Sequence, residues 1–188
     1  MDIGTGDGLF TYNSARRSPD RFFIGLDANQ RPLQKISEKI YRKIARGGLP
    51  NVMYVQAAVE ALPTELDGVA GEIYVNFPWG SLLRAVAAGD ARVLYNLRRI
   101  CAPGADLKVL FTIDAERDRS EIERLGLPVF DDQYLNAVLP GRYAMAGFSI
   151  TKAETLSTIP AELQTSWGKR LRVGSGRKII HILATAAP

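Results

Sequence analysis

Apolar runs rich in branched and aromatic residues alternate along this chain with amphipathic segments at helical spacing. That alternation predicts an α/β fold, in which a mostly parallel sheet carries helices on both faces. The predicted strands are Arg21–Asp27, Val52–Gln56, Glu72–Phe77, Leu107–Ile113, Phe148–Leu156 and Lys178–Ala184. The predicted helices are Leu9–Ala15, Arg31–Arg46, Asp90–Cys101, Glu116–Leu125 and one between Asp131 and Ala146.

Glycine and proline set the ends of these elements. The helix over Arg31–Arg46 is expected to end at Gly47-Gly48, and the helix over Asp90–Cys101 at Pro103-Gly104. The segment Ser157–Gly176, in contrast, shows no helical pattern. Without a crossover helix the last two strands are expected to be antiparallel, and so long a loop is more often functional than idle.

Composition narrows the class of protein. The 188 residues are 46% hydrophobic, and we expect a single domain over residues 1–188 that acts as a monomer. The lone cysteine, Cys101, excludes an intrachain disulfide and fits a reducing compartment, and no apolar run could span a membrane. We expect a cytoplasmic protein without membrane contact. One cysteine and one histidine, His181, cannot assemble a typical transition-metal site, so we expect no metal and a structural role for His181.

The segment Asp2-Ile3-Gly4-Thr5-Gly6-Asp7-Gly8 directly precedes a helical pattern. Alternate glycines allow unusual backbone torsions and let a ligand approach the main chain. A phosphate-binding P-loop would need Gly-Lys-Ser/Thr, and a dinucleotide fingerprint would need a glycine where Leu9 stands. The segment is similar to the Asp-x-Gly-x-Gly turn of class I methyltransferases, which bind S-adenosylmethionine. A purely structural glycine turn is the alternative.

Two further strand ends carry residues suited to a nucleoside. Asp27 ends the strand predicted over Arg21–Asp27. A carboxylate at this place can accept both ribose hydroxyls, although Asp27 could also be a helix N-cap. The next strand ends in Gln56-Ala57-Ala58-Val59-Glu60, where small residues leave room for an adenine ring. Because open α/β sheets bind ligands at this edge, the three strand ends predict one site.

Both tryptophans of the chain, Trp79 and Trp167, stand beside glycine in predicted loops rather than on a periodic apolar face. A tryptophan is more often a core residue, but these positions favour a clamp around a base taken out of its stack. Such stacking is worth about 1–3 kcal/mol per base.

Basic residues form two clusters. One helix carries Lys35, Lys39, Arg42, Lys43 and Arg46, which a solvated helix face explains equally well. The second cluster surrounds Trp167 and comprises Lys169, Arg170, Arg172, Arg177 and Lys178, with no acidic residue among them. Contact with nucleic-acid phosphates is the better interpretation of the second cluster.

Taken together, five motifs resemble the kanamycin–apramycin-resistance methyltransferases. They are Asp-Ile-Gly-Thr-Gly-Asp-Gly, Phe-Phe-Ile-Gly-Leu-Asp-Ala-Asn, Gln-Ala-Ala-Val-Glu, Phe-Pro-Trp-Gly-Ser-Leu-Leu and Thr-Ser-Trp-Gly-Lys-Arg-Leu, in order from residue 2. The resemblance implies a class I, Rossmann-like methyltransferase fold. It also implies methyl transfer from S-adenosylmethionine to N1 of one adenosine in the decoding site of 16S rRNA, within the 30S subunit, with aminoglycoside resistance as the result.

The resemblance assigns roles to particular residues. Asp2, Gly4, Gly6 and Asp27 would hold the methionine and ribose parts of the cofactor, and Ala58, Val59 and Glu60 would frame its adenine. Asn76, Ser81 and Ser166 would line the rest of the pocket. Trp79 and Trp167 would sandwich the flipped base, with Ser166 beside them, and Lys39, Arg42, Lys43, Arg170 and Arg177, with a looser match at Arg124, would bind rRNA phosphates.

The start of the chain departs from this pattern. Only Met1 precedes Asp2, where such folds have a central strand of several apolar residues. We therefore expect a truncated first strand, with a gap in the sheet and unpaired neighbouring edges. The chain would then be either an N-terminally shortened piece or a poorly folding remnant.

Adenine N1 offers an in-plane lone pair, so no proton has to be removed and we expect no general base. Two alternatives stay open. The segment Asn76-Phe77-Pro78-Trp79 faintly resembles the Asn-Pro-Pro-aromatic motif of amino-group methylases, which indicates another nucleobase or a protein amide as substrate. The missing strand indicates a nonenzymatic RNA-binding remnant.

Overall fold

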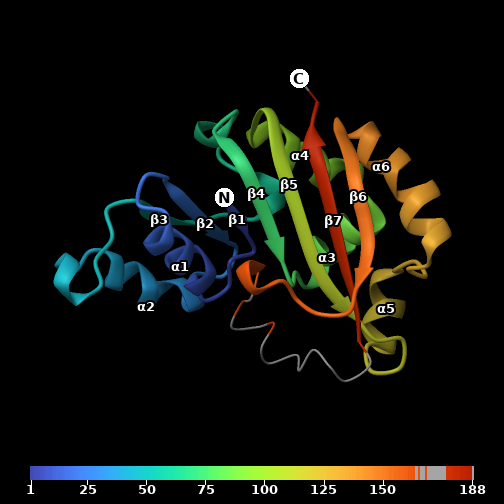
Figure 1. Ribbon diagram of the computed structural model, residues 1–188, viewed down its shortest axis with the longest axis horizontal. Helices are drawn as coiled ribbons and strands as arrows, with labels where there is room; N and C mark the ends of the chain where they lie inside the picture. The colour runs from blue at the N-terminus through green and yellow to red at the C-terminus, as the bar shows by residue number, and fades with distance from the viewer. Residues whose placement is uncertain (164, 166–167, 169–176, 188) are drawn as a thin grey trace.

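The computed structural model describes residues 1–163, 165, 168 and 177–187. Seven strands form one sheet in the order β3-β2-β1-β4-β5-β7-β6. The strands are β1 (Asp2–Ile3), β2 (Phe23–Asp27), β3 (Val52–Gln56), β4 (Ala70–Asn76), β5 (Cys101–Ile113), β6 (Phe148–Leu156) and β7 (Lys178–Ala186). The first five are parallel, and β7 runs antiparallel to both β5 and β6 (Figure 1). The predicted fold class and the antiparallel final pair are confirmed.

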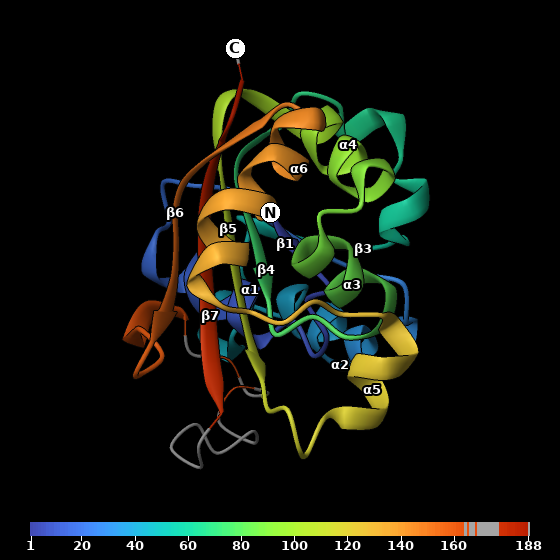
Figure 2. The same cartoon turned by 90° about the vertical axis from the view of Figure 1, so that its right-hand side faces the viewer.

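Helices cover both faces of the sheet. They are α1 (Leu9–Arg17), α2 (Gln30–Ile40), α3 (Gly80–Ala88), α4 (Ala91–Ile100), α5 (Arg119–Leu125) and α6 (Leu139–Met145), the last preceded by a π-helical turn over Tyr134–Val138. The larger core lies between the sheet and α3, α4 and α6, which Figure 2 shows on one side of β5, β6 and β7. A smaller core packs α1 and α2 against β2 and β3. No described helix is long and apolar enough to cross a membrane.

The first strand is short, as expected, but the sheet has no gap at this point. Asp2 and Ile3 pair with Gly25 and Leu26 of β2, and Asp2 also pairs with Tyr74 of β4. The two residues of β1 therefore join the two halves of the sheet. The expectation of unpaired edges on both neighbours is wrong.

Two helix predictions need correction. The helix predicted over Arg31–Arg46 ends at Ile40, because the chain turns back and the Leu49 amide donates to the Ile40 carbonyl (3.0 Å). Ile44, which continues the three- and four-residue apolar spacing of Leu33, Ile36 and Ile40 and so favoured a longer helix, is 77% exposed in a short 3₁₀ turn. Helix α3 was not predicted, because it directly follows the Phe77–Gly80 segment and has only two polar side chains, Ser81 and Arg84.

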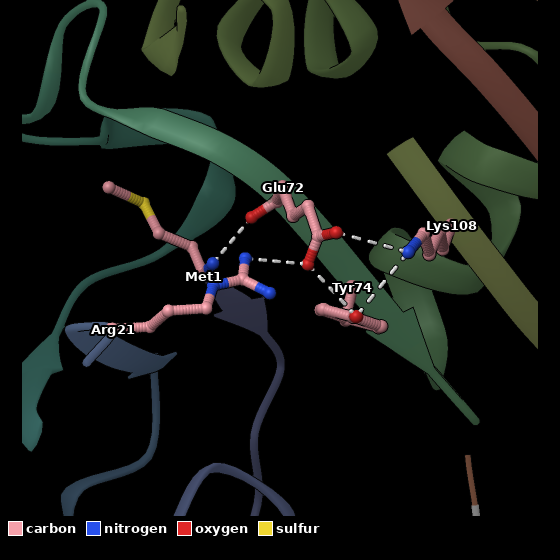
Figure 3. A network of polar contacts seen from close by, with 5 residues as sticks. All are labelled: Met1, Arg21, Glu72, Tyr74 and Lys108. Carbon is pink, nitrogen blue, oxygen red and sulfur yellow. Dashed lines mark hydrogen bonds and ion pairs between the residues drawn. The ribbon is translucent and has the colours of Figure 1, made fainter. Parts of the chain in front are cut away.

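A network of charges closes the end of the sheet where β4 begins (Figure 3). The Glu72 carboxylate accepts hydrogen bonds from Arg21 (2.8 Å), Lys108 (3.3 Å) and the Tyr74 hydroxyl (3.1 Å). The amino group of Met1 donates to the Glu72 carbonyl (2.5 Å). Since Arg21 precedes β2 and Lys108 lies in β5, this network links the segment before β2 to β4 and β5.

Candidate active site

The glycine turn between β1 and α1 has the backbone geometry that its sequence requires. Gly4, Gly6 and Gly8 have φ angles of 73°, 60° and 69°, which side-chain-bearing residues rarely adopt. Space is also limited, because a Cβ at Gly4 would lie 2.8 Å from Leu82, and one at Gly8 would lie 2.6 Å from the Tyr54 ring. The Tyr54 hydroxyl donates to the Gly8 carbonyl (2.8 Å) and fixes the turn. The turn is therefore closely packed against side chains at Gly4 and Gly8 and is open at Gly6.

Asp2 stabilises this turn from within the protein. Its carboxylate is buried and accepts hydrogen bonds from the hydroxyls of Thr5 and Thr11. Burial raises the pKa of Asp2 above its ordinary value, and the two hydroxyl donors oppose that rise. Both hydroxyls donate to the same carboxylate oxygen, Oδ2, so the carboxylate keeps acceptor capacity for a ligand.

Asp27 ends β2 and connects two loops of the site. One carboxylate oxygen accepts from the Gly6 amide (2.8 Å), and the other accepts from the Asn29 amide (2.9 Å). These bonds fix the carboxylate at the pocket, and each oxygen retains a second lone pair for a ribose hydroxyl. The helix N-cap of α2 is Asn29 rather than Asp27.

The turn after β3 carries Ala58, Val59 and Glu60 and is held from below by α4. The Asn96 side-chain amide donates to the carbonyls of Val59 (3.0 Å) and Glu60 (3.2 Å). Val59 is buried and Glu60 is exposed. The turn is thereby fixed at the edge of the pocket.

Strand β4 ends in Asn76, after which the chain turns sharply. Phe77 has a φ of 50°, a left-handed conformation that is uncommon outside glycine, asparagine and aspartate. Trp79 then caps α3 and is 47% exposed, which excludes the core role that a tryptophan usually has. The Asn76 side chain is buried, and neither its oxygen nor its nitrogen has a hydrogen-bond partner among the described residues.

These strand ends surround one pocket of about 620 Å³. Every described residue that was predicted for the cofactor or the base lines it: Asp2, Gly4, Gly6, Asp27, Ala58, Val59, Glu60, Asn76, Trp79 and Ser81. Phe10, Pro32 and Leu82 also line the pocket and were not predicted from the sequence. Their only signal was proximity to a predicted site segment. Ser166 and Trp167 lie outside the described residues.

Of the residues predicted to contact phosphates, some are exposed without an ion-pair partner among the described residues, some contact another side chain, and the rest lie outside the described residues. Arg42 and Lys43 are exposed in the turn after α2, whereas the Lys39 ammonium lies over the Tyr12 ring (4.0 Å). The Arg177 side chain is 12% exposed and donates hydrogen bonds from Nη1 and Nη2 to the two carboxylate oxygens of Asp118 (2.5 and 3.0 Å). Arg124 is 60% exposed and pairs with Glu121 (2.6 Å). Lys169, Arg170 and Arg172 lie outside the described residues.

Other predicted roles concern residues away from the pocket. His181 lies in β7 with Nδ1 3.3 Å from a Glu154 carboxylate oxygen, and it does not line the pocket. Cys101 is buried, and burial raises the pKa of its thiol to about 11. The described part of the chain holds no group of three or more histidine, cysteine or acidic residues that could bind a metal ion.

Comparison with known proteins identifies relatives over the full length of the chain. The NpmA family model, described as 16S rRNA (adenine(1408)-N(1))-methyltransferase, matches residues 1–186. A protein of that description from Streptoalloteichus tenebrarius is 38% identical over 191 residues, covering 100% of this chain and 87% of the relative.

Solved structures agree with this match. The crystal structure of the aminoglycoside resistance methyltransferase NpmB1 has a TM-score of 0.87 and 46% identity, covering 99% of this chain and 85% of that one. A mutant 16S rRNA (adenine(1408)-N(1))-methyltransferase from Catenulisporales acidiphilia, solved with cosubstrate SAM, has a TM-score of 0.87 and 31% identity, covering 100% and 84%. With a family model matching nearly every residue and relatives this similar, the chain belongs to the S-adenosylmethionine-dependent 16S rRNA (adenine(1408)-N(1))-methyltransferase family.

Proposed function

We propose that this chain transfers a methyl group from S-adenosylmethionine to N1 of an adenosine in the decoding-site helix of 16S rRNA, and that the modification confers aminoglycoside resistance. One observation carries the proposal. A single pocket connects the acidic and glycine-rich ends of β1 and β2 with an exposed tryptophan at the end of β4. Such a pocket can hold an adenosyl cofactor and a flipped base side by side.

The cofactor end of the pocket suits an adenosyl amino acid. Asp27 offers two carboxylate oxygens to a ribose, and the tight turn at Gly4 lets a ligand approach the main chain. The Asp2 carboxylate and the backbone of the glycine turn would hold the methionine part. When bound, the cofactor supplies a methyl group on a positively charged sulfur.

The base end of the pocket would act through position. Trp79 is half exposed and lines the pocket, where stacking of a flipped adenine on its ring would be worth about 1–3 kcal/mol. The lone pair of N1 lies in the plane of the base and needs no proton removed. Holding N1 in line with the methyl group and the sulfur that carries it can supply about 7–11 kcal/mol in favourable cases, so no general base is required.

The remaining assignments concern the context of the reaction. We propose that the substrate is 16S rRNA within the 30S subunit and that the enzyme acts as a cytoplasmic monomer. Arg42 and Lys43 support the RNA contact, because both are exposed on a turn that no described acidic residue neutralises through an ion pair. Arg124 and Arg177 have acidic partners and contribute less to this surface.

Trp79 provides the deciding experiment. Single-turnover methylation of 30S subunits and thermal melting should be measured on Trp79→Ala and Trp79→Phe. Because the ring is half exposed, we expect Trp79→Ala to keep its melting temperature and lose most activity, while Trp79→Phe retains part of the activity. Primer extension locates the modified nucleotide. A fully active Trp79→Ala protein, or modification of a different base by the wild type, would contradict the proposal.

A further inference from the structure

The side-chain amide of Asn76 stands apart from the other buried polar groups of the pocket. Asn76 is 8% exposed, lines the pocket, and has no hydrogen-bond partner for either amide atom in the part of the chain that the structure describes. Asp2, Thr5 and Thr11, which are equally buried, all bond to one another. Because buried polar groups are nearly always paired, an unpaired amide on a residue that lines a pocket points to a ligand.

The order of the strands indicates which ligand this is. Residues suited to the adenine, the ribose and the methionine part of the cofactor follow β3, β2 and β1, which are neighbours in that order. The next strand is β4, and Asn76 is its last residue. Asn76 therefore lies beyond the cofactor, on the side where Trp79 forms the rim. This is the place for the accepting base.

The chemistry of adenine matches an amide oxygen at this place. Next to N1, the Watson–Crick edge carries the 6-amino group, which donates hydrogen bonds. As N1 forms its bond to the methyl group, the methyl–sulfur bond breaks, the sulfur becomes a neutral thioether, and the positive charge passes to the ring and makes the amino group a stronger donor. An acceptor aimed at that group would bind the transition state more tightly than the ground state.

We propose that Asn76 holds the target adenine through its 6-amino group, with the amide oxygen Oδ1 as the acceptor. The inference rests on the proposed function, since it assumes an adenine in the pocket. Asn76 thereby becomes a positioning and specificity residue for the base, and its unpaired state belongs to the enzyme without RNA.

The test compares two target nucleosides. 30S subunits are reassembled with 16S rRNA that carries either adenosine or purine ribonucleoside, which lacks the 6-amino group, at the target position. Wild-type methylation of the adenosine subunits is measured first, and its failure would refute the proposed function rather than this inference. The single-turnover rate ratio of adenosine to purine is then compared between the wild type and Asn76→Leu. Adenosine and purine ribonucleoside differ in the nucleophilicity of N1, but that difference is the same whichever enzyme acts on them. It therefore cancels when the two rate ratios are compared.

We expect Asn76→Leu to lower the adenosine rate at least tenfold and to reduce the adenosine-to-purine ratio at least tenfold. Affinity for S-adenosylmethionine should stay within twofold. The melting temperature should not fall, because an apolar side chain replaces an unpaired buried amide. Asn76→Ala provides a second variant of smaller volume if leucine disturbs the pocket. Asn136→Ala, at an exposed asparagine outside the pocket, is the matched control and should behave as wild type.

Three results would overturn the inference. An unchanged adenosine-to-purine ratio would show that Asn76 does not contact the 6-amino group. A loss of cofactor affinity equal to the loss of rate would assign Asn76 to the cofactor. A large fall in melting temperature in both variants would assign it to the fold.

Discussion

Asp27 shows how one side chain can have a structural and a binding role. It accepts from the Gly6 amide and the Asn29 amide, so it connects the glycine turn to the start of α2. The sequence predicted Asp27 from its place at a strand end, and the structure places it in the pocket. The bond to Gly6 was not predictable, because the two residues are 21 positions apart and meet only through strand pairing.

The first prediction concerns this residue. Asp27→Ala should weaken S-adenosylmethionine binding by about 1.5–3 kcal/mol, the range for hydrogen bonds to charged groups, when measured by calorimetry. Asp20→Ala removes an exposed acid from the turn before β2 and should leave the affinity unchanged. Equal affinities for wild type and Asp27→Ala would remove Asp27 from the cofactor site.

At the scale of elements, strand bounds were predicted accurately at the two edges of the sheet and less accurately in its interior, where β5 begins at Cys101 rather than at Leu107. The strands Val52–Gln56 and Phe148–Leu156 have the predicted bounds. The predicted end of α2 at Arg46 was wrong. The spacing of Ile44 matched a helix, but the chain already turns after Ile40, where the Leu49 amide donates to the Ile40 carbonyl. Long-range pairs such as Arg177 with Asp118, 59 positions apart, leave no local signal at all.

That pair leads to the second prediction. The Arg177–Asp118 ion pair joins the start of β7 to the N-terminus of α5, and its side chains are only 12% and 10% exposed. Arg177→Ala leaves the largely buried Asp118 carboxylate with the Asp114 amide as donor but without a counter-charge, and should lower the free energy of unfolding by about 2–4 kcal/mol. Arg124→Ala, which breaks the exposed pair with Glu121, should change it little. Urea denaturation of both variants distinguishes these outcomes, and equal stabilities would mean that the Arg177 pair is not structural.

The third prediction concerns the Glu72 network. Partial burial would raise the pKa of this carboxyl, but the hydrogen bond from Arg21 and the charge of Lys108 outweigh it and hold the pKa below the ordinary value of 4.5. A lowered folded-state pKa adds stability above about pH 4.5 that is lost as the pH falls through the folded value. Melting curves from pH 7 to 3 should therefore fall less steeply for Glu72→Gln than for wild type.

Glu121→Gln is the comparison for that series. The hydrogen bond from Arg124 also lowers the pKa of the Glu121 carboxyl. The Glu121–Arg124 pair, however, lies on the surface and bridges one turn of α5. Between pH 7 and 3, the melting temperature of Glu121→Gln should therefore fall about as steeply as that of wild type. Identical acid limbs for Glu72→Gln and wild type would show that the network does not couple to folding.

For the molecule as a whole, the two faces of the sheet differ in their tasks. The face under α3, α4 and α6 holds the larger core, and the turn after α2 on the other face carries exposed basic residues. Contact with RNA phosphates releases counterions, so each lost contact should reduce the salt slope of binding by about one.

The fourth prediction follows from that surface. The double variant Arg42→Gln, Lys43→Gln should bind 30S subunits more weakly at low salt and with a slope reduced by about two, at unchanged cofactor affinity. Arg92→Gln removes an exposed charge from α4 on the opposite face and should keep the wild-type slope. Filter binding between low and moderate salt measures all three proteins. A slope that is unchanged in the double variant would assign Arg42 and Lys43 to ordinary surface charge.

The two hydrogen bonds from Asn96 to the Val59–Glu60 turn limit the motion of that turn. Helix α4, which carries Asn96, continues into β5 without a connecting loop, since Ile100 ends the helix and Cys101 begins the strand. The turn is therefore attached to the interior of the sheet and has little freedom left to lose when adenine arrives, which favours fast and tight capture. In hydrogen-exchange terms, ligand binding at this turn should slow exchange of the α4 amides well away from the ligand itself.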